Sequence, residues 1–389
     1  MKLHTRRLFL LFALLLAACS GKAPAETGPV ELPPTPYPDT PSPARIDAPL
    51  VEAPAMIELE MFNELEGWAV TDAEIARTND GAITWYNVSP PDVIETGYSI
   101  DSFFLDSGHA WVQKPDLENF PNSGTLYRTT DGGQTWTEHS VPFSRGDLHF
   151  VDAEHGWMLA DLGVGAGSNA VAVFQTNNGG ATWQKKYTND PNDAHAADSL
   201  PLGGLKSDIL PLDMNNAWVT GVVYAPGEVY LFHTGDGGVT WKQVTLPLPP
   251  GAENFELGID DGQMQFVSPT EGYIALRMSG DRTEMAVYTT RDAGNSWSLS
   301  PTLLDGAGPS SFLTAQEVVI YNGRQFNVTR DAAQSWQQVT PDVAFGEAFA
   351  ALEFVNLMSG WVITMDPSTN QRSLYRTLDG GATWLPAVP

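Results

Sequence analysis

Carboxylates are the most abundant side chains in this sequence that could carry out chemistry. The chain of 389 residues contains 47 Asp and Glu, seven His and a single cysteine, Cys19. Two carboxyl groups held about 5 Å apart, or roughly 6.5–9.5 Å apart, can cleave a glycosidic bond. A chain this rich in acids can hold such a pair at many places, so the motifs around the acids must decide between catalysis and structure.

The most regular acids stand in an octapeptide of the form T-x-D-x-G-x-T-W, which occurs in seven copies, of which Thr129–Trp136 is the clearest. An Asp at such a turn can accept hydrogen bonds from amides one or two residues further on, and Gly supplies a positive φ. Asn178 replaces Asp in the third copy, which a hydrogen-bond acceptor tolerates and a general acid does not. We therefore interpret this position as structural, and we expect looser or differently twisted turns where Ala82 and Ala333 replace the second Gly. The seven residues at the acid position are Asp80, Asp131, Asn178, Asp236, Asp292, Asp331 and Asp379, and the closing tryptophans are Trp85, Trp136, Trp183, Trp241, Trp297, Trp336 and Trp384.

These tryptophans recur at intervals of 39 to 58 residues, close to the length of one four-stranded propeller blade. A second motif precedes the octapeptide, as in Phe150–Trp157 and Phe354–Trp361. The two motifs together account for all twelve tryptophans, so no Trp remains for a sugar-stacking platform. The sequence thus predicts an all-β fold, a seven-bladed β-propeller of four-stranded antiparallel blades over residues 56–389. A short contribution of residues 50–52 to the last blade stays open.

The N-terminus has the form of an export signal. Lys2, Arg6 and Arg7 precede an apolar run, and Leu16–Cys19 resembles a bacterial lipobox. We predict a signal peptide over residues 1–18, a lipidated Cys19, and a disordered proline-rich linker over residues 19–55. The protein would then be an extracytoplasmic lipoprotein of a bacterial cell membrane, periplasmic or at the cell surface, attached by its lipid alone. The alternative is an ordinary signal peptide with an incidental cysteine.

Charge and cysteine content exclude several classes of function. The net charge is −27, and removal of the signal would take away three positive charges and no negative ones. Such a surface repels nucleic acid and anionic lipid, so we expect no nucleic-acid partner. With Cys19 lipidated, disulfides, cysteine nucleophiles and cysteine metal sites are excluded.

The octapeptide resembles the Asp-box, or BNR, repeat of sialidases, xyloglucan-cleaving glycosidases, sortilin-type receptors and photosystem II assembly factors. The phrase F-V-D-x-x-x-G-W-x-V, followed by R-T-x-D-G-G-x-T-W, is most similar to the photosystem II stability and assembly factor family. Leu374–Trp384 and Gly67–Val70 are the stretches that match it best. The resemblance covers roughly residues 56–389 and implies a propeller that binds a partner or serves as an assembly scaffold.

The enzymes of this group imply features that the sequence lacks. Sialidases carry an arginine in an F/Y-R-I-P motif near the start of the propeller, whereas Arg45 and Ile46 lie between Ala44 and Asp47 in the linker. Xyloglucan-cleaving enzymes use two propellers, and this chain holds one. We therefore expect a binding protein without catalytic residues. A sialidase-like or glucanase-like glycoside hydrolase, or a glycan-binding propeller, is the alternative.

Any binding site is expected on one face of the disc, because the loops of variable length all emerge there and loops often carry function. These acidic loops would suit a cationic protein or envelope partner, or calcium. No D-x-[DN]-x-[DN]-G loop is present, and no cofactor is otherwise expected. His109 and His155 are interpreted as turn residues and not as metal ligands, and we expect a monomer. The candidate binding face comprises Phe120, Asp190, Asp193, His195, Asp198, Tyr224, Asp260 and Asp261.

Overall fold

The computed structural model describes residues 46–93, 96 and 100–387. The predicted signal peptide, Cys19 and most of the predicted linker lie outside these residues. The chain from Pro43 onward forms one unit by its internal contacts, and the description below concerns that unit. Within the described residues, no helix has the length and apolar character needed to cross a membrane.

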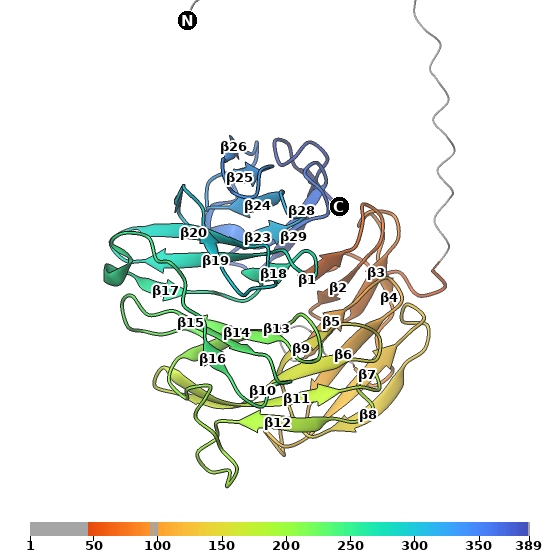
Figure 1. Ribbon diagram of the computed structural model, residues 1–389. Coiled ribbons are helices and arrows are strands. Elements are labelled where there is room, and N and C mark those ends of the chain that lie inside the picture. The colour runs from red at the N-terminus through yellow and green to blue at the C-terminus, as the bar shows by residue number, and fades with distance from the viewer. Residues whose placement is uncertain (1–45, 94–95, 97–99, 388–389) are drawn as a thin grey trace, which may run out of the picture. The chain divides into compact units, whose positions relative to one another are not determined.

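Antiparallel strands form nearly all the regular structure of the described residues, in six sheets (Figure 1). Five sheets have four strands each, paired in sequence order, and the sixth has ten. The prediction of an all-β propeller built from four-stranded antiparallel sheets is confirmed. The four-stranded sheets consist of β1 (Met56–Met61), β2 (Gly67–Thr71), β3 (Ile75–Thr78) and β4 (Tyr86–Asn87); β5 (Asp101–Phe104), β6 (Ala110–Pro115), β7 (Gly124–Thr129) and β8 (Thr137–Val141); β9 (Gly146–Phe150), β10 (Gly156–Gly165), β11 (Ser168–Thr176) and β12 (Gln184–Thr188); β23 (Ser310–Phe312), β24 (Val318–Tyr321), β25 (Phe326–Thr329) and β26 (Gln337–Val339); and β27 (Phe349–Phe354), β28 (Gly360–Met365), β29 (Arg372–Thr377) and β30 (Leu385–Pro386).

The ten-stranded sheet joins two groups of strands. Val222 at the end of one central strand pairs with Gly258, and the short strand that holds Gly258 pairs in turn with the next group. The described residues therefore form six sheets, and seven separate ones are not seen. The strands are β13 (Leu205–Pro211), β14 (Ala217–Val222), β15 (Tyr230–Thr234), β16 (Lys242–Gln243), β17 (Glu256–Gly258), β18 (Met264–Phe266), β19 (Gly272–Ser279), β20 (Thr283–Thr290), β21 (Ser298–Leu299) and β22 (Leu304–Asp305), and the 3-10 turns are η2 (Ala252–Asn254) and η3 (Gly346–Ala348).

Each octapeptide forms the hairpin between two antiparallel strands: β3–β4, β7–β8, β11–β12, β15–β16, β20–β21, β25–β26 and β29–β30. In the copy between β7 and β8, Oδ1 of Asp131 accepts hydrogen bonds from the Thr129 hydroxyl at 2.8 Å and the Thr135 amide at 2.9 Å. The Thr135 hydroxyl donates to Oδ2 at 2.6 Å. Asn178 Oδ1 still accepts a hydrogen bond from the Thr182 amide at 2.9 Å, and its Nδ2 donates to the Thr182 hydroxyl. An acceptor oxygen at this position thus closes the hairpin.

The expectation of looser turns at Ala82 and Ala333 is wrong. Their φ values of 69° and 63° lie in the same left-handed region as the 82° of Gly133. The Ala82 amide donates to the Thr78 hydroxyl at 3.1 Å, as the Gly133 amide does to its threonine at 2.9 Å. The hydrogen bonds of the hairpin hold the alanines in a conformation that costs an L residue about 1 kcal/mol or more.

Aromatic side chains tie successive groups of strands together. Trp68 of the first group stacks on Phe104 of the second, with ring centroids 5.3 Å apart, and Trp111 stacks on Phe150 of the third at 3.7 Å. The Trp136 indole nitrogen donates across the first boundary to the Val88 carbonyl at 2.9 Å. Because large aromatic surfaces are buried between the sheets, each sheet depends on its neighbour for its core.

The first and last sheets also meet. Glu64, which follows β1, accepts hydrogen bonds from the side chains of Asn356 and Ser359 in the last group, both at 2.9 Å. Leu50 forms an isolated antiparallel bridge with Tyr86 of the first sheet, so the segment just before β1 extends the first sheet and not the last. These contacts close the circle of sheets, and β1, β5, β9 and β13 lie toward its centre in Figure 1.

Candidate functional site

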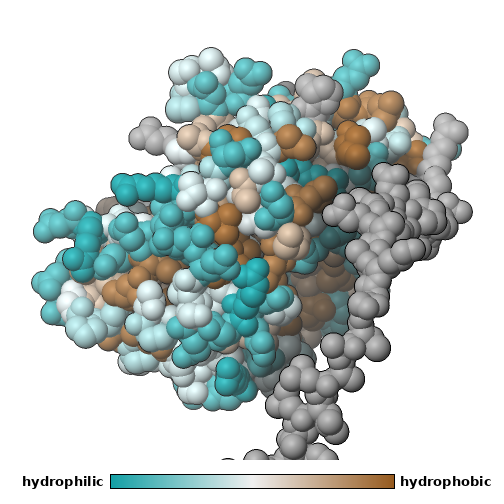
Figure 2. Space-filling model, turned by 90° about the horizontal axis from the view of Figure 1, so that it is seen from above, coloured by the Kyte–Doolittle hydropathy of each residue, from teal (hydrophilic) through white to brown (hydrophobic). Residues whose placement is uncertain are grey.

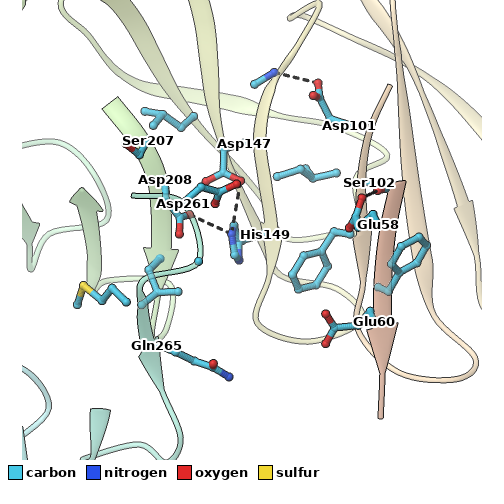
Figure 3. A pocket seen from close by; sticks show the side chains of 18 of the residues that line it. Glu58, Glu60, Asp101, Ser102, Asp147, His149, Ser207, Asp208, Asp261 and Gln265 are labelled. Carbon is cyan, nitrogen blue, oxygen red and sulfur yellow. Dashed lines mark hydrogen bonds and ion pairs between the residues drawn. The ribbon is translucent and has the colours of Figure 1, made fainter. Parts of the chain in front are cut away.

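A pocket of about 1210 Å³ lies among the inner strands of the sheets (Figure 3). Residues of β1, β5, β9, β13, β18, β23 and β27 line it. Its charged lining is mainly acidic. The charged or titratable lining residues are Glu58, Glu60, Asp101, Asp147, Asp161, Asp208, Asp261 and Glu353, together with Arg145, Lys206 and His149.

Strand alternation explains why polar groups face this space. In β1, Glu58 and Glu60 line the pocket, while Leu59 and Met61 between them are buried in the protein core. In β9, Asp147 and His149 line the pocket, and Leu148 is buried on the other side. Successive side chains of a strand point to opposite faces, so each inner strand presents every second residue to the centre.

Carboxylates also connect neighbouring inner strands. The Ser102 hydroxyl of β5 donates to Glu58 of β1 at 2.9 Å, and the Gly146 amide of β9 donates to Asp101 of β5 at 3.0 Å. The Ile209 amide of β13 donates to Oδ2 of Asp147 in β9 at 2.5 Å. These bonds fix the acids in place without neutralising their charge.

Three glutamates, Glu58, Glu60 and Glu353, form one acidic part of the lining and are called the pocket glutamates below. Burial among protein atoms raises the pKa of Glu58 to about 7, although its side chain faces the open volume of the pocket, and nearby Asp261 and Asp101 add to the rise. Burial and the negative charge of Glu58 raise the pKa of Glu60 to about 7. Burial and the charge of Glu60 raise the pKa of Glu353 well above its usual value.

The lysine and the arginine of the lining do not pair with these glutamates, although the charge of His149 lowers the pKa of Glu60 somewhat against the larger effect of burial. Lys206 donates to three backbone carbonyls, those of Asn169, Leu202 and Gly204, at 2.8–3.1 Å. Among the described residues, no Lys or Arg forms an ion pair with a pocket glutamate. The glutamates repel one another, and this part of the pocket would attract a positive group.

A second polar group lies on β9 and β13. His149 Nε2 is 3.5 Å from Oδ1 of Asp147 and 3.2 Å from Oδ1 of Asp208. One ligand atom from each of the three residues lies within 4.8 Å of the others. Figure 3 shows Asp261 beside them. This Asp147–His149–Asp208 cluster is the one group of described residues whose ligand atoms are close enough to hold a metal ion together.

Only one residue of the candidate binding face, Asp261, lines the pocket. Asp260 holds the Arg277 guanidinium with two hydrogen bonds, at 2.7 and 3.0 Å, and Asp193 pairs with Lys185 at 2.6 Å. The other residues of that face are also outside the lining: Phe120, Asp190, His195, Asp198 and Tyr224.

The two histidines of the exposed turns lie apart from the pocket lining. Hydrophilic residues cover much of the face seen in Figure 2, with apolar residues scattered between them. His109 and His155 contact Asp106 and Asp152 through Nδ1, at 3.0 Å and 2.9–3.0 Å, within exposed turns.

The sequence analysis missed seven of the lining residues: Glu58, Glu60, Asp101, Asp147, His149, Asp208 and Glu353. The sequence did contain a signal for them. In three of the repeats, a titratable residue directly precedes the aromatic residue or Met at the start of the second motif, as in Glu60-Met61, His149-Phe150 and Glu353-Phe354. A charged residue at an inward position of the innermost strand is costly to bury, and it therefore marks the centre of a propeller as a site to inspect.

Comparison with known proteins gives distant matches to two kinds of propeller, while no protein-family model matches the chain. Xyloglucanase Xgh74A of Acetivibrio thermocellus is 24% identical over 290 residues, which cover 68% of this chain and 29% of that protein. The photosystem II assembly lipoprotein Ycf48 of Synechococcus sp. is 26% identical over 259 residues, 61% of this chain and 72% of that protein. The chain thus spans about three-tenths of the length of the xyloglucanase.

Two solved structures share the fold. One, described as YCF48 bound to D1 peptide, has 17% identity and a TM-score of 0.53, and the match covers 86% of this chain and 99% of that one. The other, an ancestral GH74 enzyme, has 12% identity and a TM-score of 0.51, and covers 85% of this chain and 47% of that one. At these identities the likeness shows the propeller fold.

The expectation that the protein has no catalytic activity is contradicted by the xyloglucanase matches, which point to a possible glycoside hydrolase. The pocket also brings several carboxyl groups together. The sequence argument failed because it relied on the absence of features of known enzyme families, and it gave no role to the acids of the inner strands.

Proposed function

We propose that the chain is a partner-binding or assembly propeller, and that its central pocket receives a basic segment of a partner polypeptide. The observation that carries this proposal is the set of pocket glutamates, which have raised pKa values and no Lys or Arg partner. A lysine or arginine entering the pocket would stabilise their ionised forms and gain charge-assisted hydrogen bonds. The structure described as YCF48 bound to D1 peptide offers a precedent for a peptide ligand on this fold.

We also propose that the propeller has seven blades. We take the ten-stranded sheet as two blades, β13–β16 and β17–β22, which gives seven blades, one for each octapeptide. Seven inner strands line the pocket, in keeping with that number. The octapeptides would then be Asp-box turns that act as structural clasps. Export by residues 1–18, a lipid on Cys19 and an extracytoplasmic, monomeric protein complete the picture.

Binding of short peptides at two pH values tests the basic-segment proposal. Fluorescent ten-residue peptides with two or three Lys or Arg residues are titrated with the purified protein at pH 8 and at pH 5.5. We expect binding at pH 8 and at least a tenfold loss at pH 5.5, because groups with a pKa of about 7 become neutral in between. Ordinary surface carboxylates, with a pKa near 4, stay ionised at both pH values. Equal binding at both would place the peptide on the outer surface and overturn the proposal.

Glycoside hydrolysis is the second candidate. It is favoured by Glu58, which keeps its proton up to about pH 7, as a general acid does, in a cavity that also holds ionisable Asp101. Phe103 and Phe104 supply aromatic surface in the same lining. Incubation with xyloglucan oligosaccharides, followed by mass spectrometry, decides the matter. Turnover that Glu58→Gln abolishes would establish hydrolysis, and absence of turnover by the wild-type protein would remove this candidate.

A further inference from the structure

We propose that Asp147, His149 and Asp208 bind one divalent metal ion of the zinc class at the edge of the central pocket. The inference goes beyond the proposed function and does not depend on it. Asp147 and His149 stand two residues apart on β9 and therefore share its inward face. Asp208 comes from β13, which pairs with no strand of that sheet but is joined to it by the hydrogen bond from Ile209 to Asp147.

The distances from the His149 ring nitrogen to the two carboxylates fit a small cation. Bonds of about 2.0–2.2 Å from zinc to nitrogen and oxygen, at tetrahedral angles, separate neighbouring ligand atoms by roughly 3.3–3.5 Å. His149 Nε2 lies 3.5 Å from Oδ1 of Asp147 and 3.2 Å from Oδ1 of Asp208. These two separations match those around a zinc ion, and all three ligand atoms lie within 4.8 Å of one another.

An unsatisfied buried atom points to the ligand independently. The Asp208 side chain is only 4% exposed, and its Oδ1 receives no hydrogen bond. His149 Nε2 is within hydrogen-bond distance of this oxygen, but the direction is not that of a hydrogen bond. A nitrogen and an oxygen that lie this close without a hydrogen bond between them can both serve as ligands of one ion. A buried acceptor left without a donor costs about 1–3 kcal/mol, and more if it is charged, so a cation here would stabilise the site.

The surroundings hold the ligands in position. The Ile209 amide occupies Oδ2 of Asp147 at 2.5 Å, which leaves Oδ1 for the ion. The His149 ring packs against Phe103, with centroids 5.2 Å apart. Hydrogen bonds and packing of this kind fix the orientation of metal ligands and usually contribute tenfold or more to affinity.

The donor set indicates which metal is bound. Calcium takes six to eight oxygen ligands, and magnesium keeps most of its waters. One imidazole and two carboxylates instead suit zinc and its transition-metal neighbours, with a fourth position for water or another ligand.

Zinc titration of the full-length, untagged protein tests the site. The protein is purified in detergent, treated with a chelator and dialysed, and Zn²⁺ is added at pH 7.5 in a calorimeter with 1 mM Ca²⁺ present. We expect one saturable equivalent in the wild type and at least a tenfold weaker affinity in His149→Gln and in Asp208→Asn. His155→Gln removes the histidine of an exposed Asp–His pair and should leave the affinity unchanged.

Absence of a saturable equivalent in the wild type would overturn the proposal, as would wild-type affinity in His149→Gln. Loss of zinc binding in the presence of Ca²⁺ would also contradict it. Should a variant fail to fold by circular dichroism, the wild-type protein loaded with Co²⁺ decides. Intense visible bands of a four-coordinate nitrogen and oxygen site support the proposal, and the weak spectrum of hydrated Co²⁺ refutes it.

Discussion

The turn carboxylates and the pocket glutamates are the same chemical groups in opposite environments. Hydrogen bonds from Ser296 hold the pKa of Asp292 below its usual value, and hydrogen bonds from the Thr383 amide and hydroxyl do the same for Asp379. Burial and mutual repulsion instead raise the pKa values of Glu60 and Glu353. The turns give each acid several donors, whereas the pocket gives its glutamates few and brings them close together.

This difference separates acids that stabilise the fold from acids that destabilise it. A carboxylate with a lowered pKa favours the folded state at neutral pH, and one with a raised pKa opposes it. Groups that oppose folding and lie together in a cavity are candidates for function. The repeated motif thus marks structure, and the less regular inner strands mark the site.

The largest expected effect comes from the aromatic residue that closes a turn. Trp241 is 3% exposed and packs with Trp157 and Tyr187 between two groups of strands. Trp241→Ala should lower the free energy of unfolding by about 3–5 kcal/mol, because it leaves a large cavity. Chemical denaturation measures the change. A loss below about 1 kcal/mol would show that the turns do not hold neighbouring sheets together.

Removing a turn carboxylate should cost somewhat less. Asp236 accepts hydrogen bonds from Thr234 and from the amide and hydroxyl of Thr240, at 2.6–2.9 Å. Asp236→Ala should destabilise the protein by about 2–3 kcal/mol, since several donors lose their acceptor. Asp236→Asn is the control, and it should cost about 1 kcal/mol or less, because Asn178 makes the equivalent bonds in its own turn. Equal losses in the two variants would mean that charge, and not hydrogen bonding, closes the hairpin.

Replacement of a pocket glutamate should increase the stability of the protein at neutral pH, where replacement of a turn carboxylate decreases it. Glu60 has a pKa of about 7 in the folded protein and near 4.5 when unfolded, so the wild type loses stability as the pH rises from about 4.5 to 7. Glu60→Gln removes this loss. After allowance for solvent in the pocket, we expect the variant to be more stable by about 1–2 kcal/mol at pH 8 and unchanged at pH 4.

The exposed residue Glu138 on β8 supplies the control. Denaturation of Glu138→Gln at the same two pH values should show no difference from the wild type. A Glu60→Gln variant that is less stable than the wild type at pH 8 would place this glutamate with the structural acids of the turns.

The smallest effect concerns the strained turns. Ala333 has a φ of 63°, which glycine adopts without strain. Ala333→Gly should raise the free energy of unfolding by about 0.5 kcal/mol, once the greater freedom of glycine in the unfolded chain is subtracted. Gly133→Ala should destabilise, because its Cβ would lie 2.6 Å from Val88. Thermal melts of both variants, compared with the wild type, should show a higher melting temperature for Ala333→Gly and a lower one for Gly133→Ala.

The sequence predicted the fold well because the octapeptide is local. Its hydrogen bonds join residues within four positions of Asp131, so the motif carries its own structural explanation. The pairing of β14 with β17 depends on contacts between two groups of strands, and the count of separate sheets therefore could not be predicted. The prediction of looser turns at the alanines was wrong for a similar reason. The hydrogen bonds of the whole hairpin outweigh the preference of a single alanine for a negative φ.

The site could be predicted only in part. Asp261 was expected through its loop, whereas Asp147 and Asp208 stand 61 positions apart and meet only when β9 and β13 become neighbours. A single charged residue in a strand is common in sequences. It can be recognised as part of a site only when the fold brings several inner strands together. The expectation of a non-enzyme rested on missing family motifs, which say nothing about a cavity assembled from distant residues.

Matched removal of charge from the two regions distinguishes the pocket glutamates from the turn carboxylates as the site of peptide binding. One triple variant carries Glu58→Gln, Glu60→Gln and Glu353→Gln, and the other carries Asp131→Asn, Asp236→Asn and Asp379→Asn, so each loses three carboxylates. Affinity for the same Lys- and Arg-containing peptide is measured for both at pH 8. We predict at least a tenfold loss in the pocket variant and less than a twofold change in the turn variant. Equal losses, or a greater loss in the turn variant, would show that the pocket glutamates do not bind the basic peptide.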